Sequence, residues 1–349
     1  MLAGPLAPWS DGEMARHAST LLRHLGPFCT QLVVVYAGPK ENVVRRMLGL
    51  GGNARLIQLA DDGLGVKQWS EAARIAVEGE GFDSIYAQGL TGWAFRDAPN
   101  LVVNMHGMEM FAAGSGLIRR LGSMPSRNAA RLLLRNAHTV ITAGGDLTQM
   151  LLELGVEAAQ IATIPNGLPS DWLTARPAPR MSGPLRVLYI GRSDAAYGYD
   201  LLARALHNLA QPIALDAVGP LHPFNPGRHD VTFHGVVSSR ERIRALIDAA
   251  DVLVVPSRTI ARTELILGAL ARGRHVIATR VGATAPLLED LPSCPLIPPT
   301  ARALTAELEA FATAVPAPER FNLSRFTWSR IAMDHARVFQ RVAGGRSVA

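Results

Sequence analysis

Short apolar runs and segments with helical spacing alternate along most of the chain. The apolar runs contain few polar residues, as expected for strands whose two faces are both covered, and lie at 31–38, 101–107, 139–145, 185–192, 212–219, 251–257 and 275–279. Segments with helical spacing separate them, at 13–25, 69–78, 127–137, 145–155, 199–209, 239–249 and 263–272. This alternation predicts an α/β protein with parallel strands and helices on both faces of the sheet.

The alternation is interrupted at 168–184, where four prolines and one glycine occur without a strand or helix pattern, and a second irregular stretch lies at 291–300. We interpret the first stretch as a linker between two halves of similar size. The prediction is two Rossmann-like, doubly wound domains, residues 1–168 and 169–324, followed by a terminal helix within 325–349. Such sheets bind ligands at the carboxyl ends of their strands, so we expect the site in a cleft that the two domains face.

Composition narrows the class of protein. Hydrophobic residues make up 48% of the 349 residues and charged residues only 18%, which excludes a disordered chain. The net charge is +6, and all basic residues except Lys40 and Lys67 are arginine. Arginine suits phosphate groups or an anionic membrane surface. Aromatic residues are 6% and scattered, which argues against a nucleic-acid-binding stripe.

Cysteines and apolar segments indicate the compartment. Cys29 and Cys294 form no motif and are expected to be reduced residues of a cytoplasmic protein, with no metal site. The first residues lack the pattern of a signal peptide, and no segment reaches the roughly 20 apolar residues of a membrane span. Contact with a membrane, if any, is therefore expected to be peripheral, at its cytoplasmic face.

Several apolar runs end in a glycine or a small polar residue. Gly191 ends one run, and Arg192 then stands at the carboxyl end of the predicted strand. An arginine there suits a phosphate, although the position also fits a surface arginine without a ligand. Gly219 and Ser257 close two further runs, and Gly12 precedes the first helix. A glycine before a helix lets a ligand approach the helix N-terminus, or forms an ordinary turn.

The order of these segments is more specific than any one of them. Six stretches stand out by their order and spacing: "NMHGMEMF", "IPNG", "LYIGR", "VTFHGVV", "ADVLVVPS" and "GALARGRHVIATRVG". In these stretches the chain resembles the large family of retaining glycosyltransferases that includes sucrose synthase and bacterial mannosyltransferases (glycosyl transferases group 1). The terminal stretch "RFTWSRIAMDHARVFQRV" is similar to the family's last helix, which crosses back to the first domain.

The resemblance implies a GT-B architecture, with an acceptor-binding N-terminal domain and a nucleotide-sugar-binding C-terminal domain. The implied activity is transfer of a hexosyl group, with retention of configuration, from a nucleotide-diphosphate sugar to a hydroxyl of a sugar, a lipid-linked sugar or a metabolite. A UDP- or GDP-sugar would be the co-substrate, and no resident cofactor is implied. Because the chain has no Asp-x-Asp signature, we expect catalysis without a metal.

The family's functional residues map onto a few positions. Gly12 matches the loop that approaches the donor diphosphate, and His106 matches a histidine near the donor sugar. A core histidine satisfied by backbone groups is the alternative for His106. Arg192 matches an arginine that neutralises the diphosphate together with a lysine, but the lysine position is Tyr197. His106 and Arg192 are the predicted catalytic residues.

The chain departs from the family at two acids as well. The family's Glu-x7-Glu pair falls on Ile260 and Gly268. Glu264 lies between them and either binds a donor hydroxyl, replaces the first acid through a shifted loop, or is an acid in the first turn of a helix. We hypothesise that Arg258 or Arg262 replaces the missing lysine. The predicted donor-binding residues are Gly12, Gly191, Arg192, Tyr197, Gly219, Ser257, Arg258, Arg262, Thr263 and Glu264.

The sequence constrains the identity of the acceptor less than that of the donor. Tyr86, Gln88 and Trp93 are predicted to line an acceptor groove, with a buried aromatic patch as the alternative. A basic segment among leucines suits either anionic lipid or solvent and contains Arg119, Arg120, Arg127, Arg131 and Arg135. Two other readings stay open: a catalytically degenerate, glycosyltransferase-like binding or partner subunit, and a sugar-nucleotide epimerase on the same architecture.

Overall fold

The computed structural model describes the chain except residues 6–12, 61–62, 107–123, 174–176, 260 and 345–349. The chain divides into two compact units. Unit 1 comprises Met1–Gly167 and Trp328–Ala349, and unit 2 comprises Leu168–Thr327. The domain boundaries predicted from the sequence, after 168 and after 324, lie within a few residues of these. That the two domains face one another across a cleft stays a prediction.

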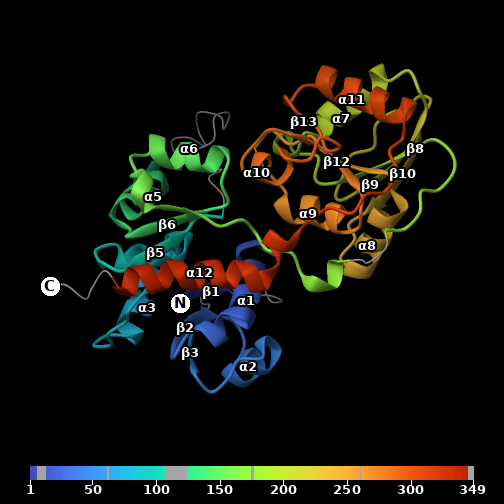
Figure 1. Ribbon diagram of the computed structural model, residues 1–349. Helices are drawn as coiled ribbons and strands as arrows, with labels where there is room; N and C mark the ends of the chain where they lie inside the picture. Colours follow the sequence, from blue (N-terminus) through green and yellow to red (C-terminus); the bar gives the residue numbers. More distant parts are fainter. Residues whose placement is uncertain (6–12, 61–62, 107–123, 174–176, 260, 345–349) are drawn as a thin grey trace. The chain divides into compact units, whose positions relative to one another are not determined.

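Unit 1 is built on a parallel sheet of seven strands in the described residues, in the order β3-β2-β1-β4-β5-β6-β7 (Figure 1). All described strands are parallel, but successive strands are added toward one edge of the sheet up to β3 and toward the other edge from β4 onward. The boundary between β1 and β4 is therefore the switch point where doubly wound sheets bind ligands. The strands are β1 (Leu2–Pro5), β2 (Leu32–Ala37), β3 (Ala54–Leu59), β4 (Ile85–Gln88), β5 (Leu101–Asn104), β6 (Thr139–Thr142) and β7 (Ile161–Thr163).

The helices of unit 1 follow the predicted apolar faces. In α1, Leu21, Leu22 and Leu25 are buried. The terminal helix α12 lies in the same unit, where Trp328 and Ile331 join Leu21 in one hydrophobic cluster. The helices are α1 (Glu13–Leu25), α2 (Glu41–Leu48), α3 (Val66–Ala76), α5 (Met124–Asn136), α6 (Asp146–Glu153) and α12 (Trp328–Gly344), with the 3-10 segment η2 (Gly89–Phe95) after β4.

Unit 2 repeats the plan with six parallel strands in the order β10-β9-β8-β11-β12-β13 (Figure 1). The strands are β8 (Leu185–Ile190), β9 (Ile213–Val218), β10 (Asp230–Gly235), β11 (Val252–Val255), β12 (His275–Thr279) and β13 (Leu296–Ile297). The α-helices are α7 (Tyr199–Asn208), α8 (Arg240–Ala249), α9 (Thr263–Ala271), α10 (Ala285–Leu288) and α11 (Ala301–Thr313). The predicted α/β fold with two Rossmann-like domains is therefore confirmed.

Helix α9 carries two predicted site residues and is deeply buried in unit 2. Ile266, Leu267 and Leu270 are at most 1% exposed and pack against β11 and β12. Full burial of each such side chain contributes about 1.5–3 kcal/mol relative to exposure. The packing therefore fixes the position of the first turn of α9, where Thr263 and Glu264 lie.

The described residues of the predicted linker belong to unit 2 and make contacts within it. The N–H of Leu168 donates to the carbonyl of Phe326 over 2.6 Å, and the buried guanidinium of Arg274 donates to the carbonyl of Ala178 over 2.8 Å. Pro177 lies against Gly273. The parts of the linker before and after residues 174–176 are therefore packed against the rest of unit 2.

Across the described residues, every helix is too short or too polar to traverse a lipid bilayer.

Candidate active site

Glycines at the carboxyl ends of β8 and β9 bring two backbones together. Gly219 has a φ of +128°, and a Cβ there would lie 1.9 Å from the carbonyl oxygen of Gly191. A Cβ on Gly191 would in turn lie 2.3 Å from the hydroxyl of Tyr189. Only glycine fits these positions, so the sequence signal at these strand ends reflects a close backbone approach.

The loop after β8 rests on the end of β11. Gly198 has a φ of +69°, and a Cβ there would lie 1.8 Å from the carbonyl oxygen of Pro256. The N–H of Arg258 donates to the carbonyl of Ala196 over 2.9 Å. The start of α7 is thereby held beside the segment that leads into α9. Ser257, between these contacts, is buried, and its carbonyl accepts a hydrogen bond from the Thr279 hydroxyl.

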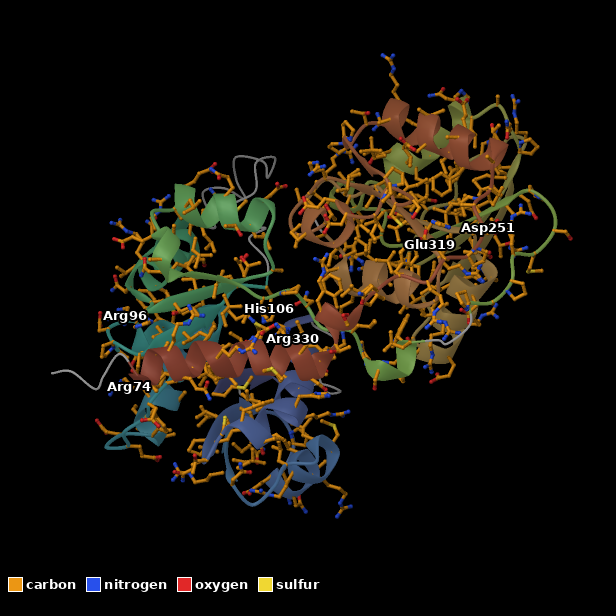
Figure 2. All side chains as sticks on the ribbon, in the orientation of Figure 1. Arg74, Arg96, His106, Asp251, Glu319 and Arg330 are labelled. Atoms are coloured by element: carbon orange, nitrogen blue, oxygen red, sulfur yellow. The ribbon has the colours of Figure 1, made fainter. Side chains whose placement is uncertain are left out.

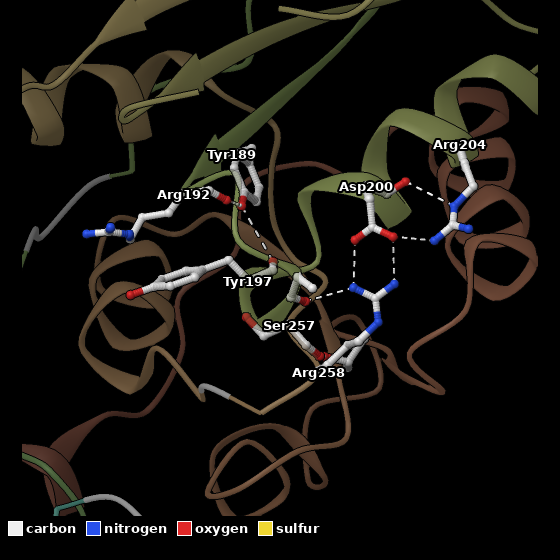
Figure 3. Close-up of polar contacts among 9 residues, drawn as sticks. Tyr189, Arg192, Tyr197, Asp200, Arg204, Ser257 and Arg258 are labelled. Carbon is white, nitrogen blue, oxygen red and sulfur yellow. Dashed lines mark hydrogen bonds and ion pairs between the residues drawn. The ribbon is translucent and has the colours of Figure 1, made fainter. Parts of the chain in front are cut away.

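Arg192 stands free of the core at the end of β8. Its side chain is 59% exposed, and its Nε lies 2.8 Å from a carboxylate oxygen of Asp194. The hydrogen bond with Asp194 raises the pKa of the Arg192 guanidinium. The backbone carbonyl of Arg192 accepts a hydrogen bond from the Tyr189 hydroxyl over 3.0 Å. Figure 3 shows the side chains of Arg192 and Tyr197 extending in one direction from this loop.

Tyr197, at the position of the family's lysine, holds another arginine. The guanidinium carbon of Arg262 lies 5.5 Å from the centre of the Tyr197 ring, within cation–π range. Arg262 precedes α9 with a φ of +49°, and among the described residues it is the one non-glycine residue with positive φ. Such backbone strain costs about 1–3 kcal/mol and is common at ligand sites. A positive charge is therefore present beside the position where the lysine is missing.

Arg258, the other arginine considered for the lysine's place, is held in an ion pair. Its two terminal nitrogens bind the two carboxylate oxygens of Asp200 in α7 over 2.6 and 2.7 Å, as Figure 3 shows. One of them also donates to the carbonyl of Ala195 over 2.7 Å. The hydrogen bonds from Arg258 lower the pKa of Asp200, which pairs with Arg204 as well. The guanidinium of Arg258 is thus engaged in tying α7 to the end of β11.

The position of the family's second acid is filled by an aromatic ring. A Cβ on Gly268 would lie 2.7 Å from Cζ3 of Trp172, which belongs to the 3-10 segment η4 (Ser170–Trp172). An acidic side chain would therefore collide with the indole. The position of the first acid, 260, lies outside the described residues. Glu264 is half-buried in the first turn of α9, four residues before Gly268, and it has a polar partner.

In unit 1, His106 follows β5 and lies among aromatic side chains (Figure 2). Its Nε2 is hydrogen bonded to Oε1 of Gln88, and its ring centre lies 4.5 Å from that of His17 in α1. His17 also contacts Trp328 and His335 of α12, with ring centres 5.1 and 5.9 Å away. Burial, with a smaller contribution from His335, lowers the pKa of His106 to about 4. The imidazole is therefore neutral at pH 7.

The residues predicted to line an acceptor groove are not arranged as one. Gln88 is 0% and Tyr86 3% exposed, because β4 is a central strand between β1 and β5. Nδ2 of Asn104 donates to the Tyr86 hydroxyl over 2.8 Å and lies 3.3 Å from Nε2 of His17. Tyr86 and Gln88 are thus buried next to the histidines. This arrangement is closer to the alternative of a buried patch than to a groove.

Trp93 is separate from this cluster. It lies in η2 between two cations, with Nζ of Lys67 4.2 Å and the guanidinium carbon of Arg96 4.6 Å from its ring centre. Its aromatic face is therefore covered within the described chain.

Some predicted residues lie outside the described part of the chain. They are Gly12, Arg119 and Arg120. Of the remaining basic segment, Arg131 and Arg135 are exposed on α5, whereas Arg127 is half-buried and partnered. Both cysteines are free. No group of three His, Cys, Asp or Glu residues in the described ranges is placed to hold a metal ion.

Residues of these clusters that were not predicted from the sequence include His17, Trp172, Asp200 and His335. His17 and His335 occupy helix positions that read as part of an apolar face, and Trp172 lies in the apparent linker. None of them forms a local motif. Only the tertiary contacts bring them next to His106, Gly268 and Arg258.

Two Rossmann-like domains, with glycine-lined strand ends in the second, are the architecture of GT-B glycosyltransferases. Residues 12–167 match the model of the glycosyl transferase 4-like domain, and residues 184–315 match that of glycosyl transferases group 1. The chain belongs to this glycosyltransferase family. By sequence, no curated protein matches it.

Solved structures share the fold over the whole chain. Sucrose-phosphate synthase from Thermosynechococcus elongatus is 20% identical, with a TM-score of 0.73, covering 99% of this chain and 100% of its own. A glycosyltransferase from Rickettsia africae is 14% identical, with a TM-score of 0.68 and 98% of each chain covered. Anabaena Alr3699/HepE, solved in complex with UDP-glucose, is 16% identical, with a TM-score of 0.61, covering 100% of this chain and 99% of its own.

Proposed function

We propose that this glycosyltransferase moves a hexosyl group, with retention of configuration, from a nucleotide-diphosphate sugar to a hydroxyl of a sugar, a lipid-linked sugar or a metabolite. The observation that carries the proposal is a pair of cations near Tyr197 in unit 2: the exposed Arg192 after β8 and the half-buried Arg262, which precedes α9 and lies over the Tyr197 ring. The carboxyl ends of the strands, where Arg192 stands, form the edge at which sheets of this topology bind nucleotides. HepE, a structural relative, was solved with UDP-glucose, which supports a UDP-sugar as the first donor to test.

The chemistry that these cations suit is stabilisation of a leaving group. When the bond between the anomeric carbon and the phosphate oxygen breaks, negative charge builds on the nucleoside diphosphate and positive charge on the sugar ring. Guanidinium groups fixed beside that oxygen stabilise the charge without moving, and the start of α9 adds backbone N–H groups. Removing one such fixed donor typically costs 10²–10³ in rate.

Retention follows from the family and requires no second carboxylate. The acceptor hydroxyl attacks on the face that the diphosphate leaves, so no glycosyl-enzyme intermediate is needed, in contrast to glycosidases with paired acids. In this proposal Glu264 remains the acid nearest the position of the missing pair, and it binds a hydroxyl of the donor. His106 of unit 1, assigned to the reaction centre by the resemblance, is neutral and can accept a hydrogen bond from a hydroxyl of the sugar.

Matched arginine variants test the donor site. We expect Arg262→Ala to raise the Kd for a nucleoside diphosphate about tenfold, since a charged hydrogen bond contributes about 1.5–3 kcal/mol. Arg258→Ala is the control, because its charge is bound to Asp200, and the Kd should change less than about threefold. Calorimetry with UDP, GDP and their sugars measures both. Equal losses for the two variants, or no loss for either, would contradict the proposal.

The alternative is a donor-binding subunit without catalysis, favoured by the one observation that Trp172 occupies the space of the second acid. A screen of acceptors with the tightest-binding nucleotide sugar distinguishes the two functions. Release of nucleoside diphosphate that depends on an acceptor, with a product of unchanged anomeric configuration by NMR, establishes the transferase. Tight donor binding without release in any combination establishes the binding subunit.

A further inference from the structure

We propose that Gln88 is a positioning residue that holds the proton of His106 on Nε2, and so leaves Nδ1 as the nitrogen that accepts a hydrogen bond from a hydroxyl of the sugar substrate. The substrate part of this inference rests on the proposed function. The position of the proton is a property of the free protein and is measured without any substrate.

The backbone of Gln88 is fixed where β4 ends. Its N–H donates to Oγ1 of Thr91 over 3.0 Å, and its carbonyl lies 2.9 Å from the same hydroxyl, which donates to it. Gln88 pairs in register with Asn104 of β5, two residues before His106. The side chain of Gln88 therefore starts from a constrained point one strand away from His106.

The side chain of Gln88 can serve few partners other than His106. Gln88 is 0% exposed, and its Oε1 is hydrogen bonded to Nε2 of His106. Its Nε2 has no hydrogen-bond partner among the described residues. A buried amide that makes a single hydrogen bond loses free energy through its unpaired group, so an apolar residue would be the more stable choice if packing were its only role.

An acceptor oxygen at Nε2 determines where the proton of a neutral imidazole lies. A carbonyl oxygen is satisfied only if the nitrogen opposite it carries the proton. A neutral imidazole has one N–H, so Nδ1 must then be an acceptor. Burial keeps the His106 ring neutral, since it lowers the pKa of His106 to about 4.

Two other titratable rings face this part of the unit and keep it uncharged. His17 of α1 contacts the His106 ring, and His335 of α12 lies 5.9 Å from His17. Burial lowers the pKa of His17 well below 6.5 and that of His335 to about 4. Nδ1 of His335 lies 2.8 Å from the carbonyl of Ile331, which requires a proton on that nitrogen. Charge on either ring would oppose charge on His106, so His106 stays neutral, and among the described residues its hydrogen bond to Gln88 distinguishes the two neutral tautomers.

The tautomer is measured by ¹⁵N NMR of the full chain labelled on histidine, with His106 assigned from the signals lost in His106→Asn. We expect a protonated-type shift for Nε2 and an unprotonated-type shift for Nδ1. Gln88→Leu should mix the two tautomers. Gln88→Glu should keep the proton on Nε2 and raise the pKa of His106, because a carboxylate stabilises the imidazolium. Gln58→Leu, a glutamine on the exposed side of β3 in the same sheet, is the matched control and should change neither.

Kinetics with the donor and acceptor then test the role in turnover. Gln88→Leu should lower kcat at least tenfold with KM for the donor changed less than threefold, and Gln88→Glu should recover part of kcat and move the acid limb of the pH profile upward. A proton on Nδ1 in the wild type, or an unchanged tautomer in Gln88→Leu, overturns the inference. If Gln88→Leu does not fold, the wild-type spectrum alone decides. The predicted tautomers in a protein that turns over no nucleotide sugar would support the positioning role and count against the proposed function only.

Discussion

The indole of Trp172 lies against Gly268, 2.7 Å from where a Cβ on that glycine would be. An acidic side chain at 268, the position at which the resemblance places the family's second acid, would compete with the indole for the same space. The ring comes from the segment before β8. Any attempt to restore the acid must therefore remove the ring as well.

Gly268→Ala should destabilise the protein by about 1–2 kcal/mol. The methyl group overpacks against Trp172, which typically costs about 1–3 kcal/mol, and the gain in helix propensity returns up to about 1 kcal/mol. In a Trp172→Ala background the sign should reverse, leaving a gain of about 0.5–1 kcal/mol. Urea unfolding of the four proteins of this cycle measures both values. The same destabilisation in both backgrounds would mean that the indole is not the obstacle.

Gly219→Ala should be among the most damaging substitutions in unit 2. The added Cβ would lie 1.9 Å from the Gly191 carbonyl, and the φ of +128° is one that alanine rarely adopts. We expect a loss of at least about 3 kcal/mol, above the 1–2 kcal/mol of left-handed strain alone. Gly227→Ala, with positive φ but nothing within 4 Å, isolates the strain. Thermal unfolding should rank the two variants in that order.

The ion pair between Arg258 and Asp200 should contribute modestly to stability. Both side chains are about a third or more exposed, and exposed pairs contribute about 0.2–1 kcal/mol, with bidentate geometry at the upper end. A double-mutant cycle with Arg258→Met and Asp200→Asn should give a coupling near 1 kcal/mol that shrinks in 1 M salt. A coupling near zero at low salt would show that the pair does not hold α7 to β11.

Tyr197 should act on the donor through Arg262. Tyr197→Phe keeps the ring and should leave nucleoside diphosphate affinity within about twofold, since the cation–π contact needs no hydroxyl. Tyr197→Ala frees the guanidinium and should weaken binding severalfold, by the 0.5–1 kcal/mol or more of such a contact. Tyr197→Lys should restore binding in an Arg262→Ala background. Calorimetry is the measurement, and failure of this rescue would separate Arg262 from the lysine's role.

Acid should destabilise unit 1 through its buried histidines. Their folded pKa values are depressed, to about 4 for His106 and His335, against about 6.5 when unfolded. Between these values the unfolded chain binds more protons, so stability rises with pH from about 4 to about 6.5 and is lost as the pH falls through that window. His335→Gln should make this dependence shallower by about one proton. Urea unfolding of the wild type and this variant across that pH window is the measurement.

The fold was largely predictable because its strands are covered on both faces. The apolar runs at 101–107, 251–257 and 275–279 became β5, β11 and β12, which are fully buried. Other strands lie outside the seven predicted runs; among them, β1 contains Gly and Pro, and β3 is an edge strand with exposed polar positions. Burial on both faces, rather than strand character as such, is what the sequence pattern detects.

The site residues were predictable only where their positions depend on residues next to them in the sequence. The position of Arg192 follows from the end of its own strand, and the glycine turns follow from backbone geometry. The bond from Arg258 to Asp200 spans 58 residues and the bond from Gln88 to His106 spans 18. Residues that pair across such separations in the sequence produce no periodic pattern. The sequence alone therefore does not distinguish an arginine held in an ion pair from one available to bind a phosphate.

The position of helix α12 in unit 1 affects the order in which the two units can fold during synthesis. Its residues complete a hydrophobic cluster with Leu21 of α1 and Val102 of β5, yet all of unit 2 is encoded between them. On a ribosome, the first Rossmann sheet must therefore wait, with an apolar face uncovered, until the second domain has been synthesised. Unit 2 has its own clusters and is able to fold during that interval, so chaperone dependence should concentrate on the half that is translated first.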